Sequence, residues 1–577
     1  MAKLAARCAH LFGLSILLAG ACGGGGGAGL EPGPDASSGV DAAAPAVDSD
    51  WLFVPNHLLE VAIEIDQADW DSLRFQTRNI LGILGENCGM QPAESPFTYF
   101  PGTVTVDGIT IAQVGVRKKG FLGSLNEDKP SLKIKFNKYV MGQRLSGLKR
   151  LTLNNGIQDP SMVNQCVGYE IFAKAGVPAP RCNFAHVTLN GSSLGVYVHV
   201  EDVKKPFLRR HFTDDTGNLY EGTLSDFRNG WMGTFERKTN KSAVPGTEDR
   251  SDLLAIQAAM ELDDAAMYAA LEGLIDVDEF MRFWAVETML SHWDGYSGNN
   301  NNYFVYGDST TGLMSFIPWG VDQLFGAGGG TVSGLPVAAT KSELTQRLFL
   351  HAPARTRYLA HFREILDQAW DETELLAEVE RMNTLIAGSI VPDRKTEFDN
   401  GIATLRGVLT GRETQLLSAH SSAAASDAQS IGQPLCFNED GTADFTFSTS
   451  WEGGAGTVSM ADILIENATI PFNTPFSYAV PSEDVEEDAV LFLTGRTSAT
   501  RSVNVFITVP KDLVGPGTFQ VGQGRMQGFL FFQEDGSSDP EGFVLLSGTL
   551  TLQSGGIAPN APWQGSLQLS TWSSDIF

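Results

Sequence analysis

The sequence has few cysteines, few histidines and a shortage of basic residues, and each shortage argues against a class of function. The six cysteines and nine histidines among 577 residues form no Cys-x-x-Cys and no histidine pair at ligand spacing, which argues against a zinc site. Because 68 Asp and Glu residues outnumber 40 Lys and Arg residues, the net charge of −28 disfavours binding to nucleic acid or anionic lipid surfaces. The length and a hydrophobic content of 42% predict a folded chain of about two or three domains.

The start of the chain predicts export. Lys3 and Arg7 form a short basic region before an apolar run at 11–18, and that run is too short to span a bilayer. This pattern indicates a signal peptide over residues 1–22 and no transmembrane helix in the mature chain.

The end of this signal resembles that of a bacterial lipoprotein. It reads Leu18-Ala19-Gly20-Ala21-Cys22, and in such a signal Cys22 receives lipid and becomes the first mature residue. Ala19 stands where the pattern prefers Leu, so simple cleavage and secretion is the alternative. Residues 23–50 are rich in Gly, Ala, Pro, Ser and Asp and predict a flexible linker. We therefore expect a lipoprotein on the outer membrane or cell surface, or otherwise a secreted protein.

Four cysteines lie outside the signal, namely Cys88, Cys166, Cys182 and Cys436. An exported location permits disulfides, and four cysteines allow three pairings that the sequence does not choose among. Cys166 and Cys182 are the nearest pair, and buried free thiols are the alternative.

One stretch combines the groups that a magnesium–nucleotide site needs. Asp294 lies in a polar loop, Asn299 follows five residues later, and Asp322 comes after an apolar, strand-like run. An Asp can take a proton from an attacking hydroxyl, an Asn can offer an uncharged oxygen to a hard cation, and a later Asp can hold the ion that bridges phosphates. Protein kinases space the first pair identically. The alternative is a simple turn between a helix and a strand.

The part before this stretch predicts a strand-rich lobe over about residues 55–222. Asp107-Gly108 and Asn190-Gly191 each separate two apolar runs and are hairpin signals. A helix is expected at about Met162–Ala175, where Glu170 lies close to the apolar edge. Glu170 is read either as an ordinary solvated residue or as the partner of a phosphate-binding lysine.

Basic side chains gather on one predicted strand face. Lys133 and Lys135 alternate with apolar residues, so both point to the same side of a strand. Arg117, together with Lys118 or Lys119, adds charge from the neighbouring strand. The functional interpretation is a phosphate clamp, and the alternative is a half-exposed strand with solvated lysines.

The rest of the chain predicts two further regions. Apolar residues recur every three or four positions over 252–290 and again from Glu343 to about Ala419. This spacing indicates a helical lobe at about 250–420. Residues 421–435 read as a linker, and 436–577 carry many short strands that predict a β-sandwich of unknown role. The polar loops at 294 and 322 then lie at the junction of two lobes, where a nucleotide cleft is expected.

The motifs in this order resemble the spore-coat protein H (CotH) kinase family, a group of secreted or surface-linked proteins with an atypical protein-kinase fold. The resemblance covers about residues 55–420, so 51–420 is expected to be a CotH-like kinase domain. It is carried by Arg117-Lys118-Lys119-Gly120, Lys129-Pro130-Ser131-Leu132-Lys133-Ile134-Lys135-Phe136, Leu153-Asn154-Asn155, Leu189-Asn190-Gly191, Gly217-Asn218-Leu219-Tyr220, Asp294 to Asn299, and Pro318-Trp319 to Asp322.

The resemblance implies an α+β, two-lobed atypical kinase followed by an all-β domain, and ATP-dependent phosphorylation of Ser or Thr in extracytoplasmic proteins. It implies that Asp294 is the catalytic residue and that Asn299 and Asp322 bind Mg²⁺ or Mn²⁺. Lys133 or Lys135 would contact the phosphates of ATP, with Arg117 and Lys119 adding charge. Glu170 would be the helix partner of that lysine.

One residue departs from the family pattern. The family commonly shows Trp-Asp-x-Asp, and here Gly320 replaces the first of these acids, so only Asp322 remains. An alternative is therefore a catalytically inactive, kinase-like surface lipoprotein that acts as a binding or structural module.

Overall fold

The computed structural model describes residues 49–574 apart from 86–87, 243–246, 327–335, 434–435, 467, 483–486 and 538–540. The predicted signal peptide, Cys22 and nearly all of the predicted linker at 23–50 lie outside the described residues. Within the described part of the chain, no helix combines the length and the apolar character that crossing a membrane requires. The chain forms two compact units, one built mainly from Gly89–Gln433 and the other from Gln76–Cys88 and Pro434–Phe577.

The first unit opens with a closed β-barrel whose strands follow the order β1-β2-β3-β4-β5-β7-β6. Strand β1 pairs with β6 in parallel and with β2 in antiparallel fashion. Apolar side chains that alternate along the strands fill the interior, among them Val61, Val116, Ile134 and Leu153. The bounds are β1 (Leu59–Ile65), β2 (Phe100–Val106), β3 (Ile109–Lys119), β4 (Ser131–Lys135), β5 (Arg150–Asn154), β6 (Cys182–Leu189) and β7 (Ser192–Val200), with α2 (Gln67–Arg74) after β1.

Both predicted hairpins of this barrel are confirmed. Asp107 and Gly108 join β2 to β3 with φ of 45° and 83°, and Asn190 and Gly191 join β6 to β7 with φ of 47° and 84°. Two successive residues at positive φ match the right-handed twist of the strands, and Asn, Asp and Gly tolerate this conformation best. The sequence therefore sets the register of these pairs locally.

Helix α4 (Asn164–Lys174) covers part of the outer surface of the barrel. Val198 and Val200 on β7 belong to the same hydrophobic core as Val167 on the helix. A disulfide between Cys166 and Cys182 ties α4 to the start of β6. Because the helix lies over β7 and β6, the outer faces of β3 and β4 are left to the basic side chains.

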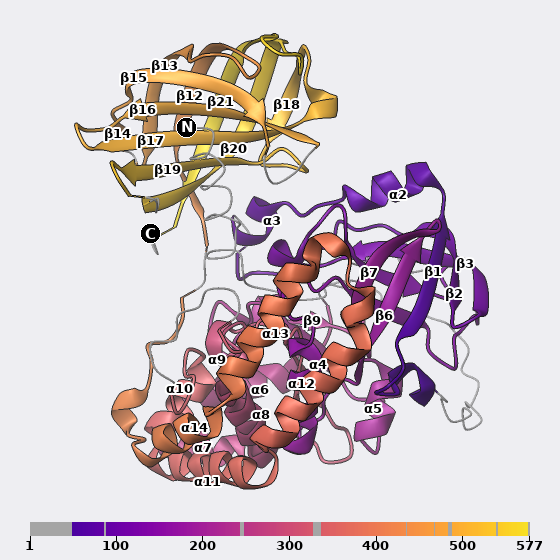
Figure 1. Ribbon diagram of the computed structural model, residues 1–577. Coiled ribbons are helices and arrows are strands. Elements are labelled where there is room, and N and C mark those ends of the chain that lie inside the picture. The colour runs from indigo at the N-terminus through magenta and orange to yellow at the C-terminus, as the bar shows by residue number, and fades with distance from the viewer. Residues whose placement is uncertain are drawn as a thin grey trace. The chain divides into compact units, whose positions relative to one another are not determined.

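The remainder of the first unit is mainly helical, as predicted, and surrounds a small sheet in the order β11-β10-β8-β9. Figure 1 shows the barrel strands at one side of this unit and helices α6–α14 at the other, with α12 and α13 passing beside α4. The strands are β8 (Leu219–Gly222), β9 (Glu236–Arg237), β10 (Tyr303–Gly307) and β11 (Met314–Pro318). The helices are α5 (Lys205–His211), α6 (Ser251–Met260), α7 (Asp264–Leu271), α8 (Val277–Met289), α9 (Tyr296–Asn299), α10 (Glu343–Leu350), α11 (Ala352–Gln368), α12 (Glu372–Ile386), α13 (Lys395–Leu409) and α14 (Arg412–Ser421).

The predicted linker at 421–435 is held against the first unit over its described residues. The N–H of Gln429 donates to Thr340 Oγ1 at 2.6 Å, and the N–H of Gly432 donates to the carbonyl of Lys341 at 2.8 Å. These bonds order a segment whose composition alone indicates a loop.

The part of the second unit that follows residue 435 is built mainly of β-strands, as predicted, and these form one continuous sheet. Its strands follow the order β12-β21-β20-β19-β17-β16-β15-β13, and β13 also pairs with β12, so the antiparallel sheet closes on itself. The predicted β-sandwich is confirmed in outline as an antiparallel, barrel- or sandwich-like domain. Its long strands β12 and β20 carry register shifts, which let the sheet coil and close. The bounds are β12 (Asn438–Ser450), β13 (Gly456–Ile465), β14 (Ala468–Ile470), β15 (Asn473–Pro481), β16 (Asp488–Arg496), β17 (Arg501–Pro510), β18 (Gly517–Val521), β19 (Gly528–Glu534), β20 (Glu541–Ser554) and β21 (Pro562–Ser573).

A short segment from the N-terminal half belongs to this β unit. Helix α3 (Ile80–Leu84) lies between α2 and β2 in the sequence, yet the N–H of Phe437 donates to the carbonyl of Leu84 at 2.6 Å. A disulfide joins Cys88 to Cys436 across 348 residues of sequence. Two separate segments of the chain therefore form the β unit, and the disulfide links the first segment, Gln76–Cys88, covalently to the second.

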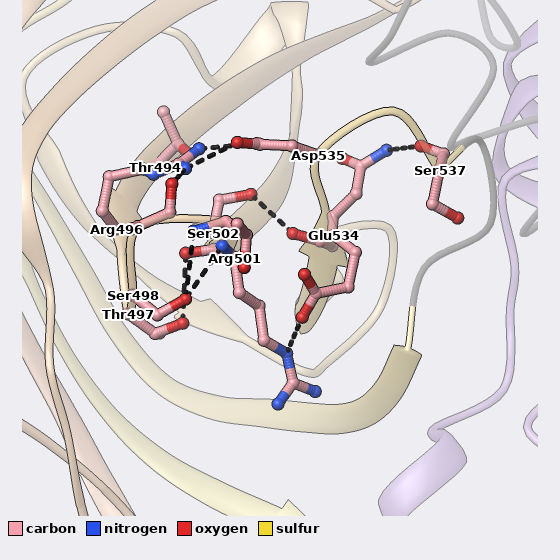
Figure 2. Close-up of polar contacts among 12 residues, drawn as sticks. Thr494, Arg496, Thr497, Ser498, Arg501, Ser502, Glu534, Asp535 and Ser537 are labelled. Atoms are coloured by element: carbon pink, nitrogen blue, oxygen red, sulfur yellow. Dashed lines mark hydrogen bonds and ion pairs between the residues drawn. The ribbon is translucent and has the colours of Figure 1, made fainter.

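Ion pairs at one end of the β unit join two of its turns (Figure 2). Both terminal nitrogens of Arg496 lie 2.7 Å from the carboxylate oxygens of Asp535, and Arg501 Nε lies 3.6 Å from Glu534 Oε1. These side chains are partly exposed, so each pair contributes no more than about 1 kcal/mol. The cluster holds the turn between β16 and β17 against the end of β19, and we assign it a structural role.

Candidate functional site

The carboxylate of Asp294 is surrounded by asparagine amides. Nδ2 of Asn299 donates to Asp294 Oδ1 at 2.7 Å, and Nδ2 of Asn302 donates to Oδ2 at 2.6 Å. Nδ2 of Asn301 lies 3.2 Å from each of the two oxygens. The structure thus brings the predicted pair Asp294 and Asn299 into contact and fixes the orientation of a carboxylate that is only 3% exposed.

A buried glutamate on α8 anchors the loop that carries Asp294. Glu287 accepts the N–H of Tyr296 at 2.9 Å and that of Ser297 at 2.8 Å, which satisfies the first turn of α9. Burial raises the pKa of Glu287 to about 7, against the effect of these hydrogen bonds. Asn300 and Asn302 both have φ of 54°, a left-handed conformation that Asn adopts more readily than most residues. Residues 294–302 thereby form a tightly held loop.

Gly295 lies so close to Glu287 that this position excludes a side chain. A Cβ at Gly295 would come within 2.3 Å of Glu287 Oε1. We therefore expect Gly295→Ala to displace the carboxylate that anchors the loop, at a cost of about 1–3 kcal/mol in the free energy of unfolding. Thermal and urea unfolding measure this cost.

Gly407→Ala is the matched control for that substitution. Gly407 lies in α13, and nothing is within 4 Å of the Cβ that would be added there. Because Ala has a higher helix propensity than Gly, this variant should be neutral or slightly stabilised. Equal stability of the two variants would contradict the anchoring role of Glu287.

Two backbone hydrogen bonds hold the Asp322 segment beside the Asp294 loop. The N–H of Trp319 donates to the carbonyl of Asn302 at 3.0 Å, and the N–H of Phe325 donates to the carbonyl of Leu290 at 2.8 Å. Asp294 lies between Leu290 and Asn302 in the sequence, and Asp322 lies between Trp319 and Phe325. Each acidic residue thus lies, in sequence, between two residues whose backbone groups bond to the other segment.

The backbone at Gly320 shows whether the acid of the family motif could be accommodated at this position. Its φ is 53°, in the left-handed region where Gly is free of strain and Asp or Asn is tolerated at modest cost. The backbone at position 320 is therefore compatible with either residue, and the missing carboxylate is a change of chemistry more than a change of fold.

The first turn of α4 contacts the Asp322 segment. Nδ2 of Asn164 donates to the carbonyl of Asp322 at 3.2 Å, while its N–H donates to Asp159 Oδ2 at 2.9 Å. Burial raises the pKa of Asp159 to about 7, and the charge of Asp322 acts in the same direction. Hydrogen bonds from Ser161 to Asp159 act against this shift.

This raised pKa predicts a pH dependence of stability. Between the ordinary value of 3.8 and about 7, folded Asp159 holds a proton that the unfolded chain lacks, so the free energy of unfolding falls as pH rises. The slope from this group is about 1.4 kcal/mol per pH unit. Asp159→Asn should flatten the stability curve by that amount when urea unfolding is compared across this range. Parallel curves for the two proteins would refute the proposed titration.

The basic side chains separate into distinct environments. In the strand ladder Arg117 lies opposite Lys133, and Lys119 lies opposite Ser131. Nη1 of Arg117 donates to Ser95 Oγ at 3.1 Å. Lys135 lies opposite Gly115 and is half-buried. The predicted cations therefore share one face of the sheet, as expected. Arg117 and Lys133 are direct cross-strand neighbours, whereas Lys119 and Lys135 each lie opposite an uncharged residue.

Lys133 is paired with an acid that the sequence analysis did not assign to it. Its Nζ lies 3.2 Å from Asp202 Oδ1, and Thr152 Oγ1 donates to the same oxygen at 2.5 Å. Burial alone would raise the pKa of Asp202, but Lys133 and Arg150 lower it below its ordinary value. Lys133 is thus held by an acid that lies two residues beyond the end of β7.

The ion pair predicted for Glu170 is not the one that the structure forms. Glu170 Oε1 lies 2.9 Å from Nζ of Lys174, one turn further along α4, and the same nitrogen lies 3.0 Å from Glu374. A neighbour at i+4 on the same helix is within reach without any change of backbone. Glu170 therefore forms its ion pair with Lys174 of the same helix, and not with Lys133 or Lys135.

A further, half-buried cation lies beside Asp202. Burial lowers the pKa of Lys204 to about 7, and the charges of Arg150, Lys238 and Lys133 lower it further. Lys238 is itself paired with Glu221 on β8 and with Glu236 on β9. These charges lie between the barrel and the small sheet, and no sequence motif indicated them.

The fit of a divalent cation rests on oxygen ligands around Asp294 and Asp322. The described residues contain no group of three or more His, Cys, Asp or Glu side chains placed to hold a metal ion by themselves. Asn300 Oδ1 and Asn302 Oδ1 are buried, and no donor in the described part of the chain bonds to them. Amide and carboxylate oxygens together with phosphate oxygens form the kind of set that Mg²⁺ prefers. The residues therefore fit a cation that arrives with a nucleotide.

A cavity of about 340 Å³ lies beside the residues that follow Asp322. It is lined by Asp159 and Asn164 at the start of α4, by Leu324 and its neighbours, and by residues 397–408 of α13. This volume falls within the range of roughly 300–1,000 Å³ that small-molecule sites occupy.

These features define a class of protein. An Asp with an Asn five residues on is joined by backbone hydrogen bonds to a segment that carries a second Asp, in a unit that combines a strand-rich barrel with a mainly helical part. The family model described as "CotH kinase protein" matches residues 116–404, half of the chain, and the chain belongs to this family. The resemblance stated from the sequence is confirmed.

Curated relatives match this chain over shorter stretches than the family model does. "Inner spore coat protein H" of Bacillus subtilis is 28% identical over 188 residues, which cover 31% of this chain and 51% of that protein. "Invasin CotH7" of Rhizopus delemar is 24% identical over 184 residues, which cover 29% of this chain and 30% of that protein. The chain thus spans about half or less of the length of these two relatives.

Two solved structures are similar to this chain at low sequence identity. The Helicobacter pylori proinflammatory kinase CtkA has a TM-score of 0.28 and 11% identity, over 52% of this chain and 91% of that chain. HipA of the Shewanella oneidensis toxin–antitoxin system has a TM-score of 0.29 and 9% identity, over 64% of this chain and 76% of that chain.

Proposed function

We propose that this chain is an exported ATP-dependent protein kinase that transfers the γ-phosphate of ATP to Ser or Thr of extracytoplasmic proteins. The observation that carries the proposal is the pair of backbone bonds that holds the Asp322 segment against the Asp294 loop. Membership of the CotH kinase family supports the use of ATP.

In the proposed mechanism Asp294 accepts the proton of the acceptor hydroxyl. The hydroxyl oxygen forms a bond to the γ-phosphorus, the bond between that phosphorus and the bridging oxygen breaks, and ADP leaves with the electron pair. Asn299, Asn301 and Asn302 keep the Asp294 carboxylate oriented toward the acceptor. Catalysis then comes mainly from positioning and from neutralisation of phosphate charge.

Asp322 and Asn299 are the proposed ligands of Mg²⁺ or Mn²⁺. When bound, the ion neutralises charge on the β- and γ-phosphate oxygens. The amide of Asn299 already donates to Asp294, which leaves its oxygen for a cation.

Export is supported by the first 22 residues of the sequence and by the cysteines. The disulfides Cys88–Cys436 and Cys166–Cys182 fit an oxidising compartment. Lipidation at Cys22 and a position on the outer membrane or cell surface are part of the proposal. A labelled-lipid incorporation assay on wild type and Cys22→Ala tests them, because only the wild type should take up label.

A second candidate is a kinase-like surface module without transfer activity. Gly320 favours it, because the metal motif of the family then keeps a single acid at Asp322. The proposed kinase and this alternative differ in phosphate transfer, whereas both are compatible with nucleotide binding.

The test is incubation of the purified chain, without residues 1–48, with γ-labelled ATP and Mg²⁺ or Mn²⁺, followed by mapping of phosphorylated sites. Wild type, Asp294→Asn and Gly320→Asp are compared, and a mixture of extracytoplasmic proteins serves as acceptor. Label on Ser or Thr with the wild type supports the kinase. Label only with Gly320→Asp would assign the natural chain to the second function. Label with none of the three proteins would refute the kinase, and also the idea that the missing carboxylate at position 320 alone prevents transfer.

A further inference from the structure

The loop between β4 and β5 presents three consecutive apolar side chains to solvent. The exposed fractions are 46% for Tyr139, 36% for Val140 and 89% for Met141. The strands beneath hold this loop, because the Tyr139 hydroxyl donates to the carbonyl of Tyr99 at 2.9 Å. Nε2 of Gln143 likewise donates to the carbonyl of Ala112 on β3 at 2.8 Å. The apolar tip at 139–141 is therefore fixed in an exposed position, and such a run on a protein surface usually marks a contact with another body.

The sequence around the tip carries positive charge only. No acidic residue occurs between Asp128 and Asp159, whereas seven basic residues do, namely Lys129, Lys133, Lys135, Lys138, Arg144, Lys149 and Arg150. Lys138 and Arg144 flank the tip in the sequence, and both are exposed. Burial raises the pKa of Tyr139, and the charge of Asp69 on α2 acts in the same direction, so one acid does act on the tip from a neighbouring element. The loop itself is basic in a chain whose net charge is −28.

The first described residues of the chain lie against the same loop. They form the short 3-10 helix η1 (Asp50–Phe53), and Nε1 of Trp51 donates to Ser146 Oγ at 2.9 Å. Leu52 belongs to the same hydrophobic core as Leu145, which strengthens this contact. Residues 23–48 separate this point from Cys22, and a Gly-rich chain of that length has an average end-to-end distance of roughly 30 Å. A lipid on Cys22 therefore keeps the loop near the bilayer that holds the lipid.

A bilayer surface matches both properties of the loop. Apolar and aromatic side chains enter the headgroup region, and lysine and arginine contact the lipid phosphates beside them. The net charge of the whole chain opposes binding to anionic lipid, but charges further away than about 8 Å are largely screened at physiological ionic strength. A contact made by the loop alone is therefore governed by the local charge.

We infer that the loop at 137–144 is a docking surface for the anionic phospholipid bilayer that carries the Cys22 lipid. Val140 and Met141 enter the headgroup region, and Lys138 and Arg144 contact the lipid phosphates. The contact fixes which side of the first unit faces the membrane. The inference rests on the proposed export and lipidation and does not depend on phosphate transfer.

The first experiment measures vesicle binding without the lipid anchor. The chain lacking residues 1–22 is sedimented with vesicles of equal parts phosphatidylglycerol and phosphatidylcholine, and with phosphatidylcholine alone. Binding should require phosphatidylglycerol and weaken with added salt. Val140→Ser with Met141→Ser should weaken it about tenfold. Lys138→Gln with Arg144→Gln should weaken it about 20-fold, or roughly fivefold for each cation.

A matched control separates the local charge from the net charge. Lys395→Gln with Arg406→Gln removes the same two charges from α13, where these partly exposed side chains pair with Asp399 and Glu380. This variant should bind the vesicles as the wild type does. Asp69→Asn removes the acid that acts on the tip and should strengthen binding, by up to about fivefold.

A second measurement reports whether the tip enters the lipid. Cys88, Cys166, Cys182 and Cys436 are paired in disulfides, so Met141→Cys in the chain lacking residues 1–22 offers one thiol to an environment-sensitive dye. Its emission should shift to the blue with phosphatidylglycerol vesicles and be quenched by lipid brominated near the headgroup. Dye on Thr396→Cys, an exposed position of α13, should show neither change.

The outcomes separate this inference from the proposed kinase. Wild-type binding by both loop variants, or an unchanged dye at position 141, would overturn the docking surface. Absence of vesicle binding together with altered transfer in the loop variants would assign the loop to the acceptor protein and overturn it as well. A wild type that binds vesicles through the loop but transfers no phosphate would defeat the kinase and support the docking surface.

Discussion

Asp294→Asn is expected to reduce phosphate transfer from ATP by about 10³-fold, because an amide cannot take up the proton of the acceptor hydroxyl. The three surrounding asparagine amides donate to the Asp294 carboxylate, and one oxygen of the new Asn side chain still accepts from them. ATP binding should therefore change little, and the loss should appear in kcat and not in KM. Initial rates with labelled ATP at several concentrations measure the two separately.

Asp367→Asn is the control for this prediction. Asp367 is an exposed acid on α11 that pairs with Arg363, far in sequence from the candidate loops. Asp367→Asn makes the same chemical change, and this variant should transfer phosphate at the wild-type rate. Wild-type kcat in Asp294→Asn, with the fold verified by its unfolding curve, would remove Asp294 from the mechanism.

Asp322→Asn is expected to remove the dependence of ATP binding on Mg²⁺. An Asn oxygen carries no charge, so the ion that accompanies the phosphates loses its only acidic protein ligand in the proposed set. Transfer should fall by about 10²-fold or more, and the rise in thermal midpoint with ATP should become the same with and without Mg²⁺.

A second variant tests whether the position of the acid matters. Gly320→Asp combined with Asp322→Asn restores a carboxylate two residues earlier, at a backbone φ of 53° that Asp tolerates. Because the side chain then starts from a different point, we expect little recovery of transfer. Full recovery would show that the site needs only an acid near the segment and not Asp322 itself.

The acidic part of the site was accessible from the sequence because it is local. Asp294 and Asn299 are five residues apart in one loop, and their contact depends on a single turn of α9. The run of asparagines that follows was visible as well, but its role was not. Only the fold shows that Asn301 and Asn302 donate to Asp294.

The basic part was less predictable because it depends on which strand faces the helix. Lys119, Lys133 and Lys135 share a face by simple alternation, and the sequence does not say how α4 lies across it. The sequence offers Glu170 as the acid near the apolar edge of that helix, but Glu170 forms its ion pair with Lys174 in the same helix.

Long-range closure was also beyond the sequence. Alternating strands at 436–577 predict an all-β unit, whereas the pairing of β12 with both β21 and β13 that closes the sheet involves partners far apart in the chain. The Cys88–Cys436 disulfide spans 348 residues and was one of three open pairings. Periodicity reports local structure and leaves such contacts undetermined.

The most direct measurement is a crystal structure with a non-hydrolysable ATP analogue and Mn²⁺, in which anomalous scattering locates the ion. The expected result is a Mn²⁺ peak bound by Asp322, Asn299 and phosphate oxygens, with the terminal phosphate facing Asp294. A nucleotide bound elsewhere, or a Mn²⁺ ion that touches neither Asp322 nor Asn299, would contradict the proposed site.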